Sequence, residues 1–300
     1  MPGCLVLSGG DPVSEEFSAS LAQALRAPKA SVHRKVFPDG ESYVRLPENA
    51  IGSSRVCVVK SLAPPQDKSL VELLLILDAL KEKGVSRVEA IVPYLAYSRQ
   101  DREFLANEAV SVRAVLRAIR HAGAESLYTV EIHKEESLSF FEGRAVSVSP
   151  YEAMAEAIEV PDGDTVVIAP DRGALGRAVR LARALGLPYD YLVKHRDRVT
   201  GEVFFEPKSL NVRGYNVIIV DDIISTGGTV AKASSILLSQ GARSVTVVVA
   251  HALLVGDAWR KLVSAGVRRV YAANTVAPAS GNPKIIDVAP AVASALGATA

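Results

Sequence analysis

Two adjacent aspartates, Asp221 and Asp222, end an apolar run and precede a loop rich in glycine and hydroxyl groups. The stretch reads NVIIVDDIISTGGTVAKASSILL, and after Thr229 its apolar spacing becomes helical. Glycines let a backbone approach a ligand closely, hydroxyls donate hydrogen bonds, and a helix start attracts anions. Carboxylates repel a phosphate but accept hydrogen bonds from sugar hydroxyls. The combination favours a phosphorylated sugar as ligand, and the alternative is an N-capped turn with solvated acids.

The loop after the aspartates differs from two common nucleotide-binding loops. It lacks the terminal Gly-Lys-Ser/Thr of a Walker A loop, and it has no GxGxxG spacing. The residues expected to hold the phosphate are Ser225, Thr226, Gly227, Gly228 and Thr229.

The stretch VFPDGESYVRL, residues 36–46, contains the turn signal Asp39-Gly40 between apolar residues. This pattern is typical of a β-hairpin. Phe37, next to such a turn, could in addition stack on a purine base. Both interpretations stay open on the residues alone.

The stretch VPYLAYSRQDR, residues 92–102, gathers charge at the end of a predicted strand. Arginine is suited to bidentate contact with phosphate, and glutamine can hydrogen-bond adenine. Arg99, Gln100 and Asp101 are therefore candidates for nucleotide binding. The alternative is a solvated loop with internal ion pairs.

His133 and Asp171 each follow an apolar run, and Asp171 also precedes a glycine-containing helix start. A lone histidine is more often structural than a metal ligand. An imidazole and a carboxylate with open positions would suit Mg²⁺ that substrate phosphates already chelate, because Mg²⁺ retains water and rarely uses an all-protein cage.

A basic loop, KHRDRVTGEV, lies between two strand-like runs at residues 194–203. It could be a surface hairpin. It could also be a lid whose cations close over developing negative charge and exclude water, which phosphoryl transfer requires.

Short apolar runs alternate with amphipathic helical patterns along the chain. Strands are predicted at 4–7, 55–60, 87–92, 127–132, 165–169, 189–194, 216–221, 244–250 and 268–272. Helices are predicted at 14–25, 67–83, 108–121, 151–158, 173–185, 229–239 and 257–264. The alternation predicts an α/β fold with parallel strands, and its restart near 144–151 predicts two tandem doubly wound domains. Ligands of such domains bind at the carboxyl ends of strands, where the motifs above are expected to lie.

The composition agrees with a globular protein that is neither strongly basic nor membrane-bound. The chain has 300 residues, of which 49% are hydrophobic and 22% charged, and its net charge is +1. We expect no nucleic-acid or membrane partner, because the Lys and Arg residues are dispersed and no window approaches 18 uninterrupted apolar residues. Without a basic leader at the N-terminus, a cytoplasmic location is expected.

VIIVDDIISTGGT resembles the ribose-phosphate-binding signature shared by type I phosphoribosyltransferases and ribose-phosphate pyrophosphokinases. VFPDGES, RQDR and the Lys-x-Arg of KHR resemble segments that the pyrophosphokinases carry and the transferases have no reason to carry. The resemblance extends over five motifs in one order, from residue 36 to residue 229. It implies a type I phosphoribosyltransferase-like fold, with an ATP-contacting domain at 1–147 and a ribose 5-phosphate and catalytic domain at 148–300.

The resemblance also implies a reaction and a role for each candidate residue. The β,γ-diphosphoryl group of ATP would move to the 1-hydroxyl of ribose 5-phosphate, giving phosphoribosyl pyrophosphate and AMP in a homo-oligomeric enzyme. Lys194 and Arg196 would be catalytic, and His133 and Asp171 would bind Mg²⁺. The residues implied to bind ATP are Phe37, Asp39, Glu41, Arg99, Gln100 and Asp101. Those implied to bind ribose 5-phosphate are Asp221, Asp222, Ser225, Thr226, Gly227, Gly228 and Thr229.

Two rival functions remain at this stage. A phosphoribosyltransferase would share the VDDIISTGGT stretch but would need no ATP. A non-catalytic regulatory relative would be expected to lack catalytic-loop or metal residues, yet Lys194, Arg196, His133 and Asp171 are all present.

Overall fold

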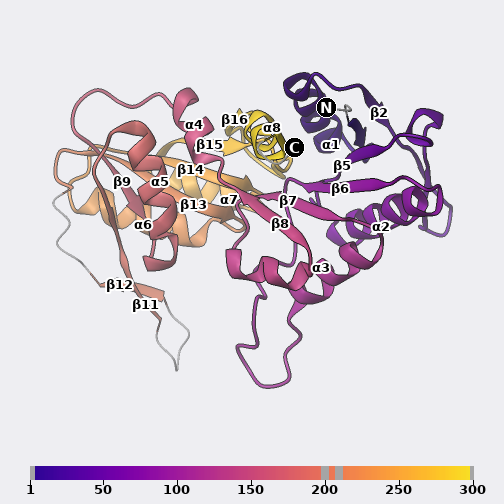
Figure 1. Ribbon diagram of the computed structural model, residues 1–300. Coiled ribbons are helices and arrows are strands. Elements are labelled where there is room, and N and C mark those ends of the chain that lie inside the picture. Colours follow the sequence, from indigo (N-terminus) through magenta and orange to yellow (C-terminus); the bar gives the residue numbers. More distant parts are fainter. Residues whose placement is uncertain (1–3, 197–202, 207–211, 298–300) are drawn as a thin grey trace. The chain divides into compact units, whose positions relative to one another are not determined.

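The computed structural model describes residues 4–196, 203–206 and 212–297 of the chain (Figure 1). The described residues form two compact units. The first unit consists of two segments, one that ends at Ser149 and one that begins at Asp287. The second unit comprises Pro150 to Ile286. Each unit is built on its own six-stranded sheet.

The first sheet has the strand order β2-β1-β5-β6-β7-β8, with every neighbouring pair parallel. Its strands are β1 (Leu5–Ser8), β2 (Lys29–Ser31), β5 (Arg55–Val59), β6 (Arg87–Val92), β7 (Ser126–Val130) and β8 (Arg144–Val148). The helices of this unit are α1 (Pro12–Leu25), α2 (Gln66–Glu82), α3 (Ser111–His121), α8 (Ala289–Gly297) and the short 3₁₀ turns η1 (Glu48–Ala50) and η2 (Glu135–Phe141). An antiparallel hairpin of β3 (His33–Val36) and β4 (Ser42–Arg45) lies outside the sheet.

The second sheet has the order β10-β9-β13-β14-β15-β16 and is also parallel throughout. Its strands are β9 (Thr165–Ala169), β10 (Tyr189–Tyr191), β13 (Asn216–Ile224), β14 (Ser244–Ala252), β15 (Val267–Ala273) and β16 (Lys284–Ile286). The helices are α4 (Tyr151–Ala157), α5 (Leu175–Leu185), α6 (Gly228–Ser239), α7 (Ala258–Ser264) and the 3₁₀ turn η3 (Arg172–Ala174). The hairpin of this unit pairs β11 (Val193–Arg196) with β12 (Val203–Glu206).

The two units share one topology. In each, the second strand lies at the sheet edge beside the first, a separate hairpin follows in sequence, and the later strands add in order on the other side. Strands alternate with helices in both, as the sequence pattern predicts. The predicted α/β class with two tandem parallel-sheet domains is confirmed.

Continuous apolar runs explain why the central strands occupy the middle of each sheet. All nine residues of β14 are buried, which requires that helices cover both faces of the sheet. Its neighbours in the core include Val217 and Ile219 of β13 and Leu237 of α6. In the part of the chain that the structure describes, none of the helices combines the length and apolar character needed to cross a membrane.

The predicted strand at 189–194 is wrong, because two separate strands occupy this region. Tyr189–Tyr191 pairs with β9 inside the sheet, whereas Val193–Arg196 leaves the sheet and pairs with β12. Leu192 between them is buried and marks the change of direction. The three-residue strands β2 and β16 escaped prediction because KAS and KII form no apolar run of strand length.

The C-terminal helix α8 packs against α1 and so belongs to the first unit (Figure 1). Val292 and Leu296 of α8 are buried, and Ser20 of α1 donates a hydrogen bond to the Asp287 carboxylate before α8. The units therefore differ from the ranges expected from the sequence, 1–147 and 148–300, in where the last segment lies. The apolar stripe of α8 is covered by a helix distant in sequence, which a linear pattern does not reveal.

We expect Leu296→Ala to lower the free energy of unfolding by about 2–5 kcal/mol, because the removed side chain leaves a cavity between α8 and its neighbours. Urea unfolding followed by circular dichroism measures the change. Ser294→Ala, an exposed position on the same helix, is the matched control. Equal stabilities of the two variants would contradict this packing.

Candidate functional site

The two aspartates predicted to face a sugar lie within β13, near its carboxyl end. The strand continues to Ile224, three residues beyond the predicted end. Asp221 is partly buried, and its backbone carbonyl accepts a hydrogen bond from the buried Tyr151 hydroxyl at 3.1 Å. Asp222 is buried and forms an ion pair with Arg177 of α5 at 3.2 Å. The strand end is thus held from α4 and from α5.

The loop between β13 and α6 is held by the chain that follows β14. The backbone N–H groups of Leu254 and Val255 donate to the carbonyls of Ile224 and Ser225 at 3.1 and 3.0 Å. Gly227 has φ +74°, and a Cβ at this position would lie 3.2 Å from the Ala258 carbonyl oxygen. Both the backbone conformation and the close approach of α7 therefore require glycine here.

Hydrogen-bond donors around this loop are available to a ligand. None of the described side chains caps the start of α6, so its first backbone N–H groups are available at the end of the helix that attracts anions. Within the described chain, no hydrogen bond is recorded for the hydroxyls of Ser225, Thr226 or Thr229. These groups form a cradle suited to a phosphate.

The Asp221 carboxyl differs electrostatically from its neighbour. Burial and the adjacent Asp222 carboxylate raise the pKa of Asp221 well above its ordinary value, although Arg177 opposes the rise. Asp222 forms an ion pair with the guanidinium of Arg177. The site therefore holds one carboxylate that is paired with a cation, and one whose raised pKa makes it bind a proton more readily than an ordinary aspartate.

Arg177 is a residue of this site that sequence reasoning missed. It also lies 3.5 Å from the Gly173 carbonyl oxygen through its Nη1 atom, so it connects the loop after β9 with the end of β13. A signal was present in the sequence, since Arg177 interrupts an apolar stripe that starts at Ala174, the N-cap of α5, and continues with Ala178 and Leu181. A charged residue on the buried face of a helix needs a buried partner, and Asp222 is that partner.

Asp171 follows β9, the strand beside β13, and therefore lies at the same sheet edge as Asp221. Its Oδ1 atom accepts a hydrogen bond from the Ala174 N–H at 3.2 Å, whereas no partner of Oδ2 is recorded among the described residues. A cavity of about 390 Å³ lies here. It is lined by Asp171, Arg172, Gly173, Tyr191, Leu192 and Val193. Arg172, which sequence reasoning did not assign, is exposed and adds a positive charge to this cavity.

The predicted hairpin at 36–46 is present in the first unit. Gly40 has φ +98°, and the Phe37 N–H donates to the Glu41 carbonyl at 2.8 Å across the turn. Asp39 accepts a hydrogen bond from the Glu41 N–H, and both side chains are exposed. Phe37 is 38% exposed and packs edge-on against Tyr43. An aromatic ring and two carboxylates are therefore presented at one hairpin tip.

The second predicted nucleotide-binding segment lies in the long connection between β6 and α3 (Figure 1). Arg99 is exposed and has no recorded partner in the described structure. Gln100 donates its amide to the Glu108 carboxylate at 3.0 Å, and Glu108 also accepts from two backbone N–H groups of the same loop. Asp101 is partly buried beside Gln100. The alternative of internal contacts thus applies to Gln100, whereas Arg99 faces solvent.

The predicted catalytic residues Lys194 and Arg196 belong to β11, opposite Phe205 and Val203 of β12. The rest of the basic loop, 197–202, falls outside the described residues. The strand follows β10, whose parallel pairing with β9 places it at the carboxyl edge of the second sheet. The backbone therefore emerges on the side where Asp171 lies.

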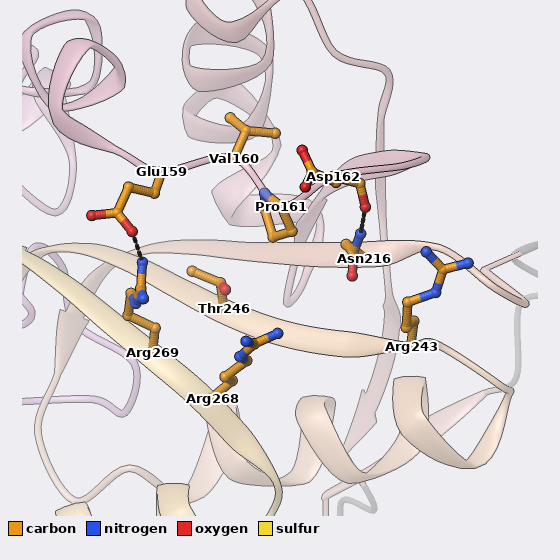
Figure 2. A pocket seen from close by; sticks show the side chains of 9 residues that line it. All are labelled: Glu159, Val160, Pro161, Asp162, Asn216, Arg243, Thr246, Arg268 and Arg269. Atoms are coloured by element: carbon orange, nitrogen blue, oxygen red, sulfur yellow. Dashed lines mark hydrogen bonds and ion pairs between the residues drawn. The ribbon is translucent and has the colours of Figure 1, made fainter.

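A further cavity, of about 380 Å³, lies at the opposite, amino-terminal edge of the second sheet (Figure 2). Asn216 and Thr246 form its floor, near the starts of β13 and β14, and Asn216 donates to the Asp162 carbonyl. Arg269 pairs with Glu159 at its rim. None of the predicted site residues lines this cavity.

Comparison with known proteins identifies the chain. Residues 6–123 match the model of the N-terminal domain of ribose phosphate pyrophosphokinase, and residues 151–274 match that of the phosphoribosyl transferase domain. A ribose-phosphate pyrophosphokinase of Sulfurisphaera tokodaii is 44% identical over 96% of this chain and 99% of that protein. One from Aeropyrum pernix is 46% identical over 91% of this chain and 89% of its own. The chain belongs to the ribose-phosphate pyrophosphokinase family.

A solved structure supports the same assignment. The phosphoribosylpyrophosphate synthetase of Mycobacterium smegmatis superposes with a TM-score of 0.86 at 28% identity, over 100% of this chain and 99% of that one. The predicted family, the type I phosphoribosyltransferase-like fold and the predicted class of enzyme, a ribose-phosphate diphosphokinase, are confirmed.

Members of this family use a divalent metal, and the donor atoms of the described residues can be tested for such an ion. No group of three or more His, Cys, Asp and Glu side chains with metal-ligand spacing occurs among them. Asp171 has an open oxygen in the second unit, and His133 is half-buried after β7 in the first unit. This chemistry suits a hard cation that substrate phosphates already chelate, and it does not suit a closed all-protein cage.

We expect Asp221→Asn to raise the melting temperature at pH 8, by an amount that shrinks as the pH falls toward about 4. The raised pKa means that the folded state binds this proton more tightly than the unfolded state, so stability falls as pH rises through that range. Asparagine cannot ionise, and its oxygen can still accept the hydrogen bond from the Asp222 N–H. Thermal melts from pH 4 to 8 measure the effect, with the exposed Asp162→Asn as control. A constant difference at every pH would contradict it.

Proposed function

We propose that the protein transfers the β,γ-diphosphoryl group of ATP to the 1-hydroxyl of ribose 5-phosphate, giving phosphoribosyl pyrophosphate and AMP. One observation supports this most. The carboxyl edge of the second sheet combines two aspartates with a helix start and three hydroxyls that no described side chain caps or binds, all within one β13–α6 segment. A phosphorylated sugar is the ligand that such a combination suits, and the family supplies the reaction.

In this proposal the β13–α6 loop binds the 5-phosphate. The hydroxyls of Ser225, Thr226 and Thr229 donate to it, and Gly227 and Gly228 allow the backbone to approach. Asp221 and Asp222, which are adjacent on β13, orient the ribose hydroxyls. Arg177 pairs with Asp222 and holds this carboxylate at the end of the strand.

ATP is assigned to the first unit. Phe37 stacks on the purine, while Asp39 and Glu41 at the same hairpin tip accept hydrogen bonds from the nucleotide. The guanidinium of Arg99 suits a bidentate contact with phosphate. Gln100 and Asp101 are assigned to the nucleotide as well, and Gln100 would have to exchange its contact with Glu108.

We assign the divalent ion as Mg²⁺, with His133 as the metal-site residue of the first unit and Asp171 as that of the second, and with substrate phosphates as further ligands. When bound, it would neutralise phosphate charge and fix the phosphate oxygens. Lys194 and Arg196 place cations beside the transferring oxygens. The residues of this chain then act by positioning and by electrostatic stabilisation, and no covalent intermediate is needed. We further propose that the protein is a cytoplasmic homo-oligomer.

AMP release tests the proposed reaction directly. The purified protein is incubated with ribose 5-phosphate, ATP and Mg²⁺, and AMP and phosphoribosyl pyrophosphate are measured. We expect both products in equal amounts. A phosphoribosyltransferase would release no AMP from these substrates, and a regulatory relative would be inactive, so absence of AMP would overturn the proposal.

We expect Lys194→Ala to reduce turnover by two or more orders of magnitude, about 3 kcal/mol, because one preorganised cation is lost from the transition state. Initial rates of AMP formation measure the loss. Lys261→Ala, which removes a lysine from a surface ion pair on α7, is the matched control and should retain activity. Near-normal AMP formation by Lys194→Ala would exclude the assigned role.

A further inference from the structure

A buried ionic cluster in the first unit joins four segments of the chain. Lys60, directly after β5, is fully buried, and its Nζ atom lies 2.6 Å from the Glu72 carboxylate of α2. The same Nζ atom donates to Asp11, the N-cap of α1, at 2.9 Å. Glu72 is 2% exposed and also accepts a hydrogen bond from Arg34 of β3 at 2.7 Å.

Two residues of the β3–β4 hairpin bind this one carboxylate. Arg34 donates to Oε2 of Glu72, and Ser42 of β4 donates to Oε1 at 3.2 Å. The register pairs Arg34 with Val44 and Val36 with Ser42, so Arg34 and Ser42 lie on the same face of the hairpin. The opposite face carries Tyr43, against which Phe37 packs. Among the described strands, none of the main sheet pairs with this hairpin, so side-chain contacts contribute to its orientation.

The backbone after β1 is shaped around this cluster. A Cβ on Gly9 would lie 2.5 Å from the Lys60 side chain, and one on Gly10 would lie 3.3 Å from the Arg34 side chain. The absence of side chains at Gly9 and Gly10 thus leaves room for the aliphatic parts of the Lys60 and Arg34 side chains. The cluster is balanced, with two cations and two carboxylates. Burial alone would raise the pKa of Asp11, but Lys60 and Ser14 outweigh burial and hold it below its ordinary value.

We propose that Glu72 is a positioning residue for ATP: it fixes the β3–β4 hairpin through Arg34 and Ser42 and thereby sets where Phe37, Asp39 and Glu41 lie. The inference rests on the proposed ATP contacts of the hairpin tip. Glu72 itself is buried beneath the hairpin, so in this proposal it acts through Arg34 and Ser42. A carboxylate with three donors on two oxygens is directional, and small misplacements of binding groups reduce activity strongly.

The double variant Arg34→Ala/Ser42→Ala tests the inference, because it releases the hairpin while keeping Lys60, Glu72 and Asp11 together. We expect the KM for ATP to rise roughly tenfold or more, while the KM for ribose 5-phosphate changes by less than about twofold. A residue needed only for folding would lower the active fraction, and hence kcat, without separating the two KM values. Arg45→Ala, an exposed arginine on the same hairpin, is the matched control and should behave as the unaltered protein.

Conservative replacement supplies a second readout. Arg34→Lys/Ser42→Thr retains a cation and a hydroxyl and should restore the KM for ATP to within about threefold. An unchanged KM for ATP in the alanine double variant, or equal rises in both KM values, would overturn the inference.

Phe37→Ala separates this inference from the proposed ATP site. If Phe37→Ala raises the KM for ATP and the alanine double variant does not, the positioning role is wrong and the hairpin assignment stands. If neither variant changes the KM for ATP, the hairpin does not contact ATP, and both fail. AMP release by the unaltered protein tests the reaction independently of either result.

Discussion

The chemistry of the second unit depends on the parallel pairing of β9 with β13. Because parallel strands end at the same edge, this pairing brings the loop after β9 beside the end of β13. The Arg177–Asp222 ion pair reinforces the arrangement, since Arg177 also reaches the Gly173 carbonyl. Breaking such a buried pair from one side leaves an uncompensated charge, which commonly costs several kcal/mol. The residues predicted to bind sugar and phosphate are therefore held in place by the core of the unit.

The same topology serves a different purpose in the first unit. Lys60 directly follows β5 at the carboxyl edge of the first sheet, and Asp221 lies near the carboxyl end of β13, the corresponding strand of the second sheet. In the second unit this edge borders the cavity that Asp171 lines. In the first unit it is filled by Lys60, Glu72 and Asp11. One edge can accept a ligand, whereas the other anchors a hairpin.

Much of the fold could be predicted from the sequence, because its elements are strongly periodic. The strand at Thr165–Ala169 and the strand at Arg87–Val92 have the predicted bounds. The strand pattern failed at 189–194, where the chain leaves the sheet without any change in apolar character. Arg177 and Glu72 were missed because their partners are distant in sequence: Asp222 lies 45 positions from Arg177, and Arg34 lies 38 positions from Glu72. An interrupted apolar stripe can mark a buried charge such as Arg177, but it does not identify the partner.

The sequence by itself determined the family, the class of reaction and the order of the motifs, because these depend on residue types and spacings within short stretches. Only the tertiary structure decided which motifs meet. Asp171 lies at the same sheet edge as Asp221 because β9 pairs with β13. The Gln100 amide donates a hydrogen bond to Glu108, and α8 packs in the first unit. Contacts between distant residues arise from the packing of whole elements, and packing selects partners that the linear order does not specify.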